Sequence, residues 1–248
     1  MVRGLFKLTW LEIKIFVREP LGFVGTVVFP VVMFIYLGRA FGAIGAHSPR
    51  APQLLGEIVP IFVTLFVSIN AALSLVAVIS IYREGGILRR LRATPLRPPI
   101  ILGAHVLVKL LFTGVSLGAI ALAGRRFYPV AVHFHAVDYS LAVLLSTLAI
   151  LSMGFVIASI VPTARFAQPI GSAILYPMVA VSGLFVPLSA LPGPWATVGR
   201  VLPFSHAVAL MHGAWVGAGW LEQWPHVGAL LAAIAVCLVI SDRVFRWE

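Results

Sequence analysis

The sequence predicts an all-α integral membrane protein with six transmembrane helices. Of its 248 residues, 60% are hydrophobic and only 10% are charged, and the mean hydropathy is +1.04. A soluble domain carries roughly 25% charged residues, so this composition excludes an ordinary soluble fold. Because about 20 apolar residues cross a bilayer, the chain has room for about six spans and short connections. No length is left for a soluble catalytic domain.

The first element, residues 1–19, is expected to be an amphipathic helix at the membrane interface. At about 100° per residue, Arg3, Lys7, Lys14 and Arg18 fall within an arc of about 60°, and apolar residues cover most of the remainder. Glu12 lies nearly opposite this basic stripe. We expect the Glu12 side to touch a partner or another part of the protein; a simple anchor in the membrane surface is the alternative.

The spans follow from the gaps between charged residues, because an unpaired charge in the hydrocarbon core is costly. The six predicted spans are 20–38, 58–82, 99–124, 139–162, 166–187 and 224–242. A short basic helix over 83–96, closed by Pro95, separates the second span from the third. Prolines interrupt the apolar stretch after the fifth span. We therefore expect residues 188–221 to form a re-entrant helical hairpin in the outer region, between spans five and six.

Basic residues orient the bundle. If both termini are cytoplasmic, twelve of the 18 Lys and Arg residues lie in inner segments and five in outer segments. The remaining one, Lys109, lies in the third span. We expect its amine to snorkel to the cytoplasmic surface, one helical turn from His105. The net charge of +10 is thus attributed to topology in the cytoplasmic membrane and not to nucleic-acid binding.

Three motifs carry a resemblance to a known family. The segment 82–96, YREGGILRRLRATPL, is similar to the cytoplasmic loop of permease subunits of type 2 ATP-binding-cassette exporters. A late series with the pattern Pro, SGxFxP, LP and LP, and an early REPLGF at 18–23, match further family motifs. The late series includes Ser182, Gly183, Phe185, Pro187, Pro192 and Pro203, and we assign it to the re-entrant region.

The resemblance implies that a helix in the loop couples the permease to a separate ATPase. The matching residues are Glu84, Gly86, Leu88, Arg89, Leu91, Arg92, Thr94 and Pro95. Two alternatives stay open: the arginines orient the chain and bind anionic lipid, and Glu84 caps a helix N-terminus. No phosphate-binding GxxxxGK[ST] occurs, so ATP and Mg are expected on the partner, and no cofactor is expected on this chain. The implied assembly has two ATPase copies and a second permease copy, as a homodimer or a heterodimer.

Polar residues at helical spacing inside the spans are candidates for a translocation path. They are Asn70 and Ser74 on the second span, and Gln168, Ser172 and Tyr176 on the fifth. Hydrogen bonds that hold the bundle together are the alternative role. Four tryptophans, Trp195, Trp215, Trp220 and Trp224, are expected to anchor the outer interface.

Other classes of function fit the sequence less well. A secondary transporter is expected to place carboxylates within its spans, yet all eight acidic residues lie outside them or at their ends. A membrane-embedded lipid-modifying enzyme needs paired acidic ligands, and a hydrolase built on Ser182 and His206 has no supporting spacing. His133 and His135 form the closest histidine pair, but no cysteine joins them and no metal site is expected. The favoured function is a non-enzymatic permease that exports a drug, lipid or glycan-lipid, whose identity the sequence does not specify.

Overall fold

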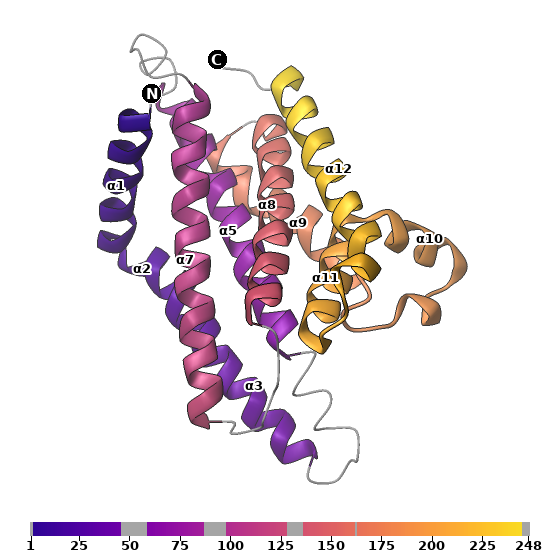
Figure 1. The fold of residues 1–248 in the computed structure, drawn as a ribbon. Coiled ribbons are helices and arrows are strands. Elements are labelled where there is room, and N and C mark those ends of the chain that lie inside the picture. The colour runs from indigo at the N-terminus through magenta and orange to yellow at the C-terminus, as the bar shows by residue number, and fades with distance from the viewer. Residues whose placement is uncertain (1, 46–58, 87–97, 128–135, 162, 245–248) are drawn as a thin grey trace.

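The computed structural model describes residues 2–45, 59–86, 98–127, 136–161 and 163–244 (Figure 1). Within these ranges the chain is helical and contains no strand, which confirms the all-α prediction. The elements are α1 (Val2–Arg18), α2 (Pro20–Phe23), the π-helix η1 (Val24–Val28), α3 (Phe29–Gly45), α5 (Val59–Glu84), α7 (Pro98–Phe127), α8 (Ala136–Ile160), α9 (Ala164–Ala180), the 3₁₀ helix η3 (Leu188–Ala190), α10 (Gly193–Val201), α11 (Pro203–Val216) and α12 (Trp220–Val244).

Four of the described helices are long and apolar enough to cross a membrane. They are Val59–Glu84, Gly103–Phe127, Ala136–Ile160 and Trp220–Ser241, and they correspond to the second, third, fourth and sixth predicted spans. The first predicted span overlaps a shorter apolar helix, Val24–Ala40. The fifth overlaps the 17-residue α9, which begins at Ala164 and ends at Ala180, before the expected limit at 187. A six-span topology stays a prediction.

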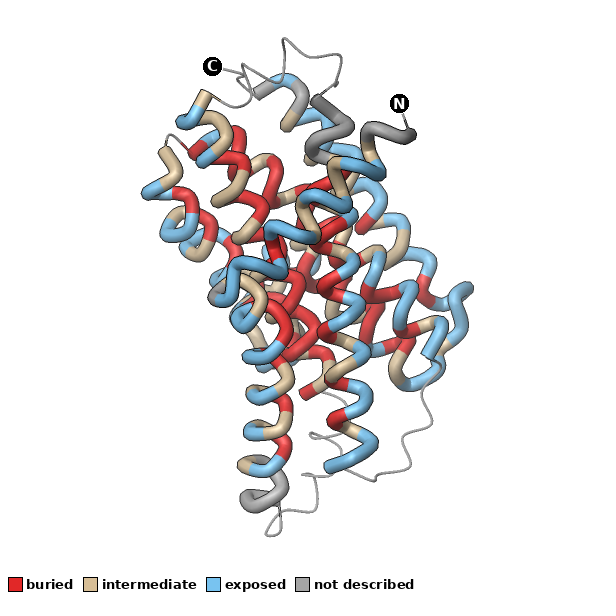
Figure 2. The backbone as a smooth tube through the Cα atoms, turned by 90° about the vertical axis from the view of Figure 1, so that its left-hand side faces the viewer, coloured by how far each residue is buried: buried red, intermediate tan, exposed pale blue. Residues whose placement is uncertain are grey.

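The helices α5 and α8 form the centre of the bundle. In the apolar window of each, 67% of the residues are buried, against 11% in α12. The buried residues gather in the middle of the bundle (Figure 2). The two central helices approach closely, since a Cβ placed on Gly154 would lie 3.3 Å from the Ala72 carbonyl oxygen. Small residues permit such close packing in membrane proteins. The main hydrophobic cluster extends from this contact to α9, α11 and α12.

Buried hydroxyl groups also join α5 to α8. Thr64 and the Tyr139 hydroxyl lie 2.9 Å apart, and Ser68 lies 2.9 Å from Thr147. These side chains are therefore interhelical hydrogen-bonding groups of the kind that stabilise a bundle in lipid.

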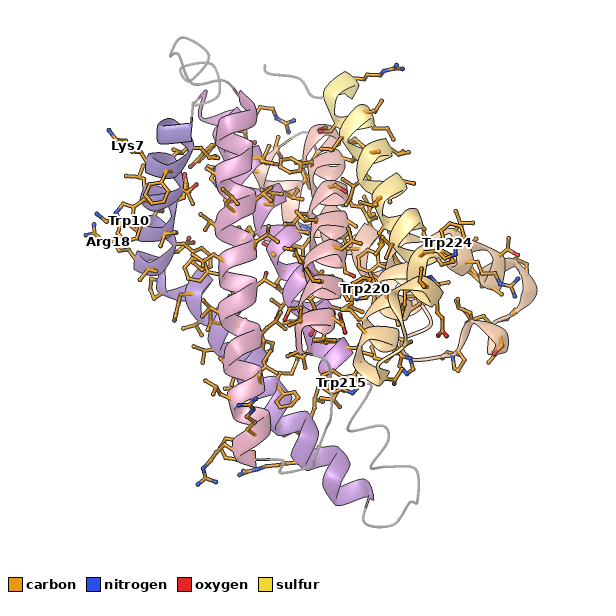
Figure 3. All side chains as sticks on the ribbon, viewed as in Figure 1. Lys7, Trp10, Arg18, Trp215, Trp220 and Trp224 are labelled. Atoms are coloured by element: carbon orange, nitrogen blue, oxygen red, sulfur yellow. The ribbon has the colours of Figure 1, made fainter. Side chains whose placement is uncertain are left out.

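The N-terminal helices form a separate layer against α7. The cluster of Phe16, Val27, Val108 and Phe112 joins α1 and η1 to α7, and the Phe16 and Phe112 rings lie 4.4 Å apart. The turn widens into a π-helix just before Pro30, because proline has no N–H to donate to the preceding turn. Lys7, Trp10 and Arg18 point away from the bundle on the outer side of α1 (Figure 3).

The region expected to be a re-entrant hairpin consists of η3, α10 and α11. Leu202 has extended backbone angles between α10 and α11, and Pro203 begins α11. The position of this region in the membrane stays a prediction. At the end of the bundle where both termini lie, α1 and α7 begin and α5, α8 and α12 end (Figure 1).

Candidate functional site

Two adjacent charged residues at the end of α5 hold the ends of two other helices. The Arg83 guanidinium donates hydrogen bonds to the carbonyl oxygens of Ala158, at 3.2 Å, and Val161, at the C-terminal end of α8. The Glu84 carboxylate accepts a hydrogen bond of 2.9 Å from the backbone N–H of Ala164, the first residue of α9. Arg83 and Glu84 are termed the α5 clamp below.

Each charge of the α5 clamp has the favourable sign for the helix end that it meets. The carbonyl end of a helix carries partial negative charge and attracts Arg83, and the amide end carries partial positive charge and attracts Glu84. Thr163, the N-cap residue of α9, makes no side-chain cap hydrogen bond. The N-terminus of α9 is therefore capped from another helix.

The chain leaves α5 directly after the clamp through a left-handed glycine. The Gly86 N–H donates to the Arg83 carbonyl oxygen at 3.1 Å, and Gly86 has φ +63°. Such a φ is accessible to glycine at little cost, which explains the glycine at this position of the loop motif. Arg83 and Glu84, expected to start the loop helix, belong to α5 instead. The other predicted coupling residues, Leu88, Arg89, Leu91, Arg92, Thr94 and Pro95, lie outside the described residues.

Glu12 connects α1 to the same end of α5. Its carboxylate accepts a hydrogen bond of 3.0 Å from the Tyr82 hydroxyl and lies 3.5 Å from Nδ1 of His105 on α7. The Tyr82 and His105 rings are 5.3 Å apart. The expectation that Glu12 touches another part of the protein is confirmed.

Lys109 contradicts the expectation that its amine reaches the cytoplasmic surface. The side chain is 4% exposed, and Nζ donates a hydrogen bond of 2.6 Å to the Ser74 hydroxyl on α5. Nζ also lies 4.6 Å from the centroid of the Phe16 ring of α1. The prediction failed because α1 covers this part of α7, so the lysine finds a polar and an aromatic partner inside the protein.

The candidate path residues on α5 and α9 bond to different partners and not to one another across the two helices. Ser74 is engaged by Lys109, and the Asn70 side-chain amide donates to the Phe66 carbonyl oxygen of its own helix. On α9, Gln168 and Tyr176 are exposed, while Ser172 is half-buried and donates to the Gln168 carbonyl oxygen. The opposite face of α9 packs on α5, where Gly171 lies against Leu73.

The residues of the SGxFxP motif shape the turn that follows α9. The Ser182 hydroxyl is buried and donates a hydrogen bond of 2.7 Å to the Val179 carbonyl oxygen. Gly183 has φ +87°. These features end α9 at Ala180, because a left-handed residue and a side-chain bond to the last turn stop a helix. The Phe185 ring packs at 5.4 Å on Phe62 of α5.

The prolines of the same motif begin or precede helices. Pro187 precedes η3, Pro192 is the N-cap residue of α10, and Pro203 is the first residue of α11. Proline suits these positions because the first N–H groups of a helix have no partner within it.

The histidine pair expected to be closest in the sequence, His133 and His135, lies outside the described residues. Within them, His206 of α11 and His226 of α12 come together, with 3.0 Å between their Nδ1 atoms. No cluster of three or more metal-ligating side chains occurs within the described ranges.

Among the tryptophans expected at the outer interface, Trp195 and Trp224 are exposed. The Trp220 indole N–H donates a hydrogen bond of 2.7 Å to the Asp138 carboxylate. The Trp215 ring packs against the Tyr139 ring, with 5.1 Å between their centroids. Trp215 therefore contributes to helix packing.

Sequence reasoning missed the roles of Tyr82 and Arg83. Both lie at the end of an apolar span beside Glu84, and an Arg in the last helical turn is a recognisable signal for a bond to free carbonyl groups. The sequence does not indicate which helix supplies those carbonyls. Here they belong to α8, 75 residues or more along the chain.

The bundle of apolar helices defines a multi-pass membrane protein, and comparison with known proteins defines its family. The model of the ABC-2 type transporter family matches residues 3–214, and the chain belongs to this family. The family match assigns the chain to the membrane components of transporters.

Curated relatives share part of this sequence. The chain is 27% identical over 150 residues to Nodulation protein J of Rhizobium leguminosarum bv. trifolii, which covers 59% of this chain and 55% of that protein. It is also 27% identical over 109 residues to Nodulation protein J of Rhizobium meliloti (strain 1021), covering 44% and 42% of the two chains. The chain thus spans about half the length of the curated relatives that it matches.

Proposed function

We propose that this chain is the permease subunit of an ATP-driven exporter in the cytoplasmic membrane, with both termini in the cytoplasm. The observation that supports the proposal most strongly is the family match over residues 3–214. The four long apolar helices and the excess of basic residues in the predicted inner segments are consistent with it.

Energy comes from a separate ATPase, which binds ATP and Mg, and two ATPase copies serve two permease copies. The contact lies in the part of the loop motif that follows α5, residues 87–96, whose arginines and leucines suit a groove with apolar and acidic lining. Support comes from the loop motif and from the rigid end of α5, where Arg83, Glu84 and Gly86 fix the direction in which the chain leaves the helix.

The second permease copy is a copy of this chain, and cargo passes along polar residues of the pair. Gln168, Ser172 and Tyr176 on α9, with Asn70 and Ser74 on α5, are the proposed path residues. The exposure of Gln168 and Tyr176 supports this role for α9. The cargo is hydrophobic or amphipathic, a drug, lipid or glycan-lipid, because the surrounding surfaces of the described helices are predominantly apolar.

Copurification with the ATPase encoded beside this chain tests the proposal. We expect the ATPase to remain bound through purification, and replacement of residues 89–95 by a Gly/Ser linker of equal length to release it. The same replacement of residues 45–51, in the predicted outer loop, is the control and is expected to retain the ATPase. Retention of the ATPase by the 89–95 replacement contradicts the coupling assignment.

A further inference from the structure

We infer that Arg83 and Glu84 are positioning residues that transmit movement of the segment after α5 to the junction of α8 and α9. The inference rests on the proposed function, in which an ATPase moves that segment. It assigns the coupling step to two side chains that lie inside the permease, at contacts between its own helices.

The clamp acts on a short connection. Only residues 161–163 separate the end of α8 from the start of α9, and Arg83 bonds to one side of this connection while Glu84 bonds to the other. A connection of three residues has little slack, so a shift of the end of α5 displaces both helix ends together.

The input side of the clamp is equally short. Gly85 and Gly86 alone separate Glu84 from the segment proposed to contact the ATPase, and both are hydrogen-bonded back to the last turn of α5. A displacement of that segment therefore reaches the clamp through two residues.

Both clamp residues bond to backbone atoms of their partners. The carbonyl oxygens of Ala158 and Val161 and the N–H of Ala164 belong to the helices themselves, so the clamp holds the helix ends regardless of the side chains there. Thr163 has a hydroxyl that suits a local N-cap, yet it makes no cap bond. The start of α9 is thus held by α5.

The output side of the clamp is the helix of the proposed path. Glu84 holds the first residue of α9, and Gln168 and Tyr176 follow on its exposed surface. The buried face of α9 rests on α5 through Gly171 and Leu73. Because α5 contacts α9 at its start and along its length, rotation of the end of α5 changes the orientation of the polar residues on α9.

The test measures the nucleotide-dependent movement of α9 in the complete complex. Spin labels are placed on two exposed residues, Ala173→Cys on α9 and Val236→Cys on α12, in a Cys237→Ser background. Distances are recorded in nanodiscs without nucleotide and with Mg-ATP and vanadate, alongside the rate of ATP hydrolysis. The variants are Arg83→Gln with Glu84→Ala, and the conservative pair Arg83→Lys with Glu84→Gln. Arg243→Gln, which changes an exposed residue of α12, is the control.

In the first pair, we expect ATPase binding and hydrolysis to persist while the nucleotide-dependent shift in label population falls by about threefold or more, within the range that single mutations have on coupling. The conservative pair is expected to retain the shift, because Lys still donates to a carbonyl and Gln still accepts from an N–H. If the two residues have a purely structural role, the first pair lowers the thermal midpoint, and the rate of hydrolysis and the label shift change together.

An unchanged shift in the first pair overturns the inference. If that pair does not fold, Glu84→Ala alone decides by the same criterion. A wild-type complex that binds the ATPase but shows no movement of α9 also overturns the inference and leaves the ATPase partnership intact. Failure of the wild-type chain to bind the ATPase contradicts the proposed function itself.

Discussion

Lys109 illustrates how a buried cation is accommodated in an apolar helix. The ammonium group donates to the Ser74 hydroxyl and lies over the Phe16 ring, and the residue is 4% exposed. Desolvation of such a charge offsets much of what these contacts contribute. The apolar stem of the side chain then accounts for most of its stabilising effect.

At this residue we predict different outcomes for two substitutions. Lys109→Ala is expected to destabilise the protein by about 2 kcal/mol, because it leaves a cavity where the stem packs. Lys109→Met fills the same space without the charge and is expected to keep the thermal midpoint or raise it. Thermal unfolding in detergent measures both, with Lys7→Ala on the outer side of α1 as the control. Equal midpoints for Lys109→Ala and Lys7→Ala contradict the buried position.

At the scale of elements, α1 docks on α5 and α7 through polar and aromatic contacts. Glu12 provides the polar contact with α5 and α7, and Phe16 provides the aromatic contact with Phe112. The outer side of α1, with Lys7, Trp10 and Arg18, faces away from the bundle (Figure 3).

We expect Glu12→Ala to loosen α1 without unfolding the bundle. Removal of the carboxylate leaves the Tyr82 hydroxyl and His105 Nδ1 without this partner, at a cost of about 1–3 kcal/mol. Hydrogen exchange of the α1 amides is expected to accelerate, while exchange in α5 and α8 stays slow. Glu12→Gln retains an acceptor for Tyr82 and is expected to have a smaller effect. Exchange in α1 that matches the wild-type rate in Glu12→Ala contradicts the contact.

The turn after α9 gives a second prediction at this scale. Gly183→Ala introduces a Cβ at φ +87°, and that Cβ would lie 3.3 Å from Leu188 Cγ. We expect a loss of about 1 kcal/mol or more, seen as a lower thermal midpoint. Gly118→Ala in α7, where no atom lies within 4 Å of the added Cβ, is the control and is expected to keep or raise the midpoint, because alanine favours a helix more than glycine does. A neutral Gly183→Ala is inconsistent with the left-handed turn.

At the scale of the whole molecule, the arrangement of helix ends predicts membrane topology. The start of α1 and the end of α12 lie at one end of the bundle, and the end of α7 lies at the other (Figure 1). Single cysteines at Lys7, Arg126 and Arg243 in a Cys237→Ser background report on the two sides. We expect an impermeant thiol reagent to label Arg126→Cys in intact cells and the other two only in inside-out vesicles. Labelling of all three from one side contradicts the orientation.

Much of the helical organisation was predictable from the sequence, and part of the site was not. Four predicted spans correspond to helices long enough to cross a membrane, because hydropathy and charge spacing are properties of consecutive residues. Gly86 and Gly183 were identified through sequence motifs. Both adopt left-handed backbone angles, which glycine favours in turns. The partners of Tyr82, Arg83 and Lys109 lie in other helices and gave no local signal.

The sequence by itself determined that this protein is embedded in lipid, that it is helical, and that it carries the family motifs. Apolar transfer free energy accumulates residue by residue along a span, so these properties do not depend on which helices meet. Only the tertiary structure decided that Glu12 reaches Tyr82, that Lys109 is buried under α1, and that α5 holds the junction of α8 and α9. The physical reason is that a charge in a low-dielectric bundle takes the nearest polar partner in space, and that partner here lies 35 to 80 residues away in sequence.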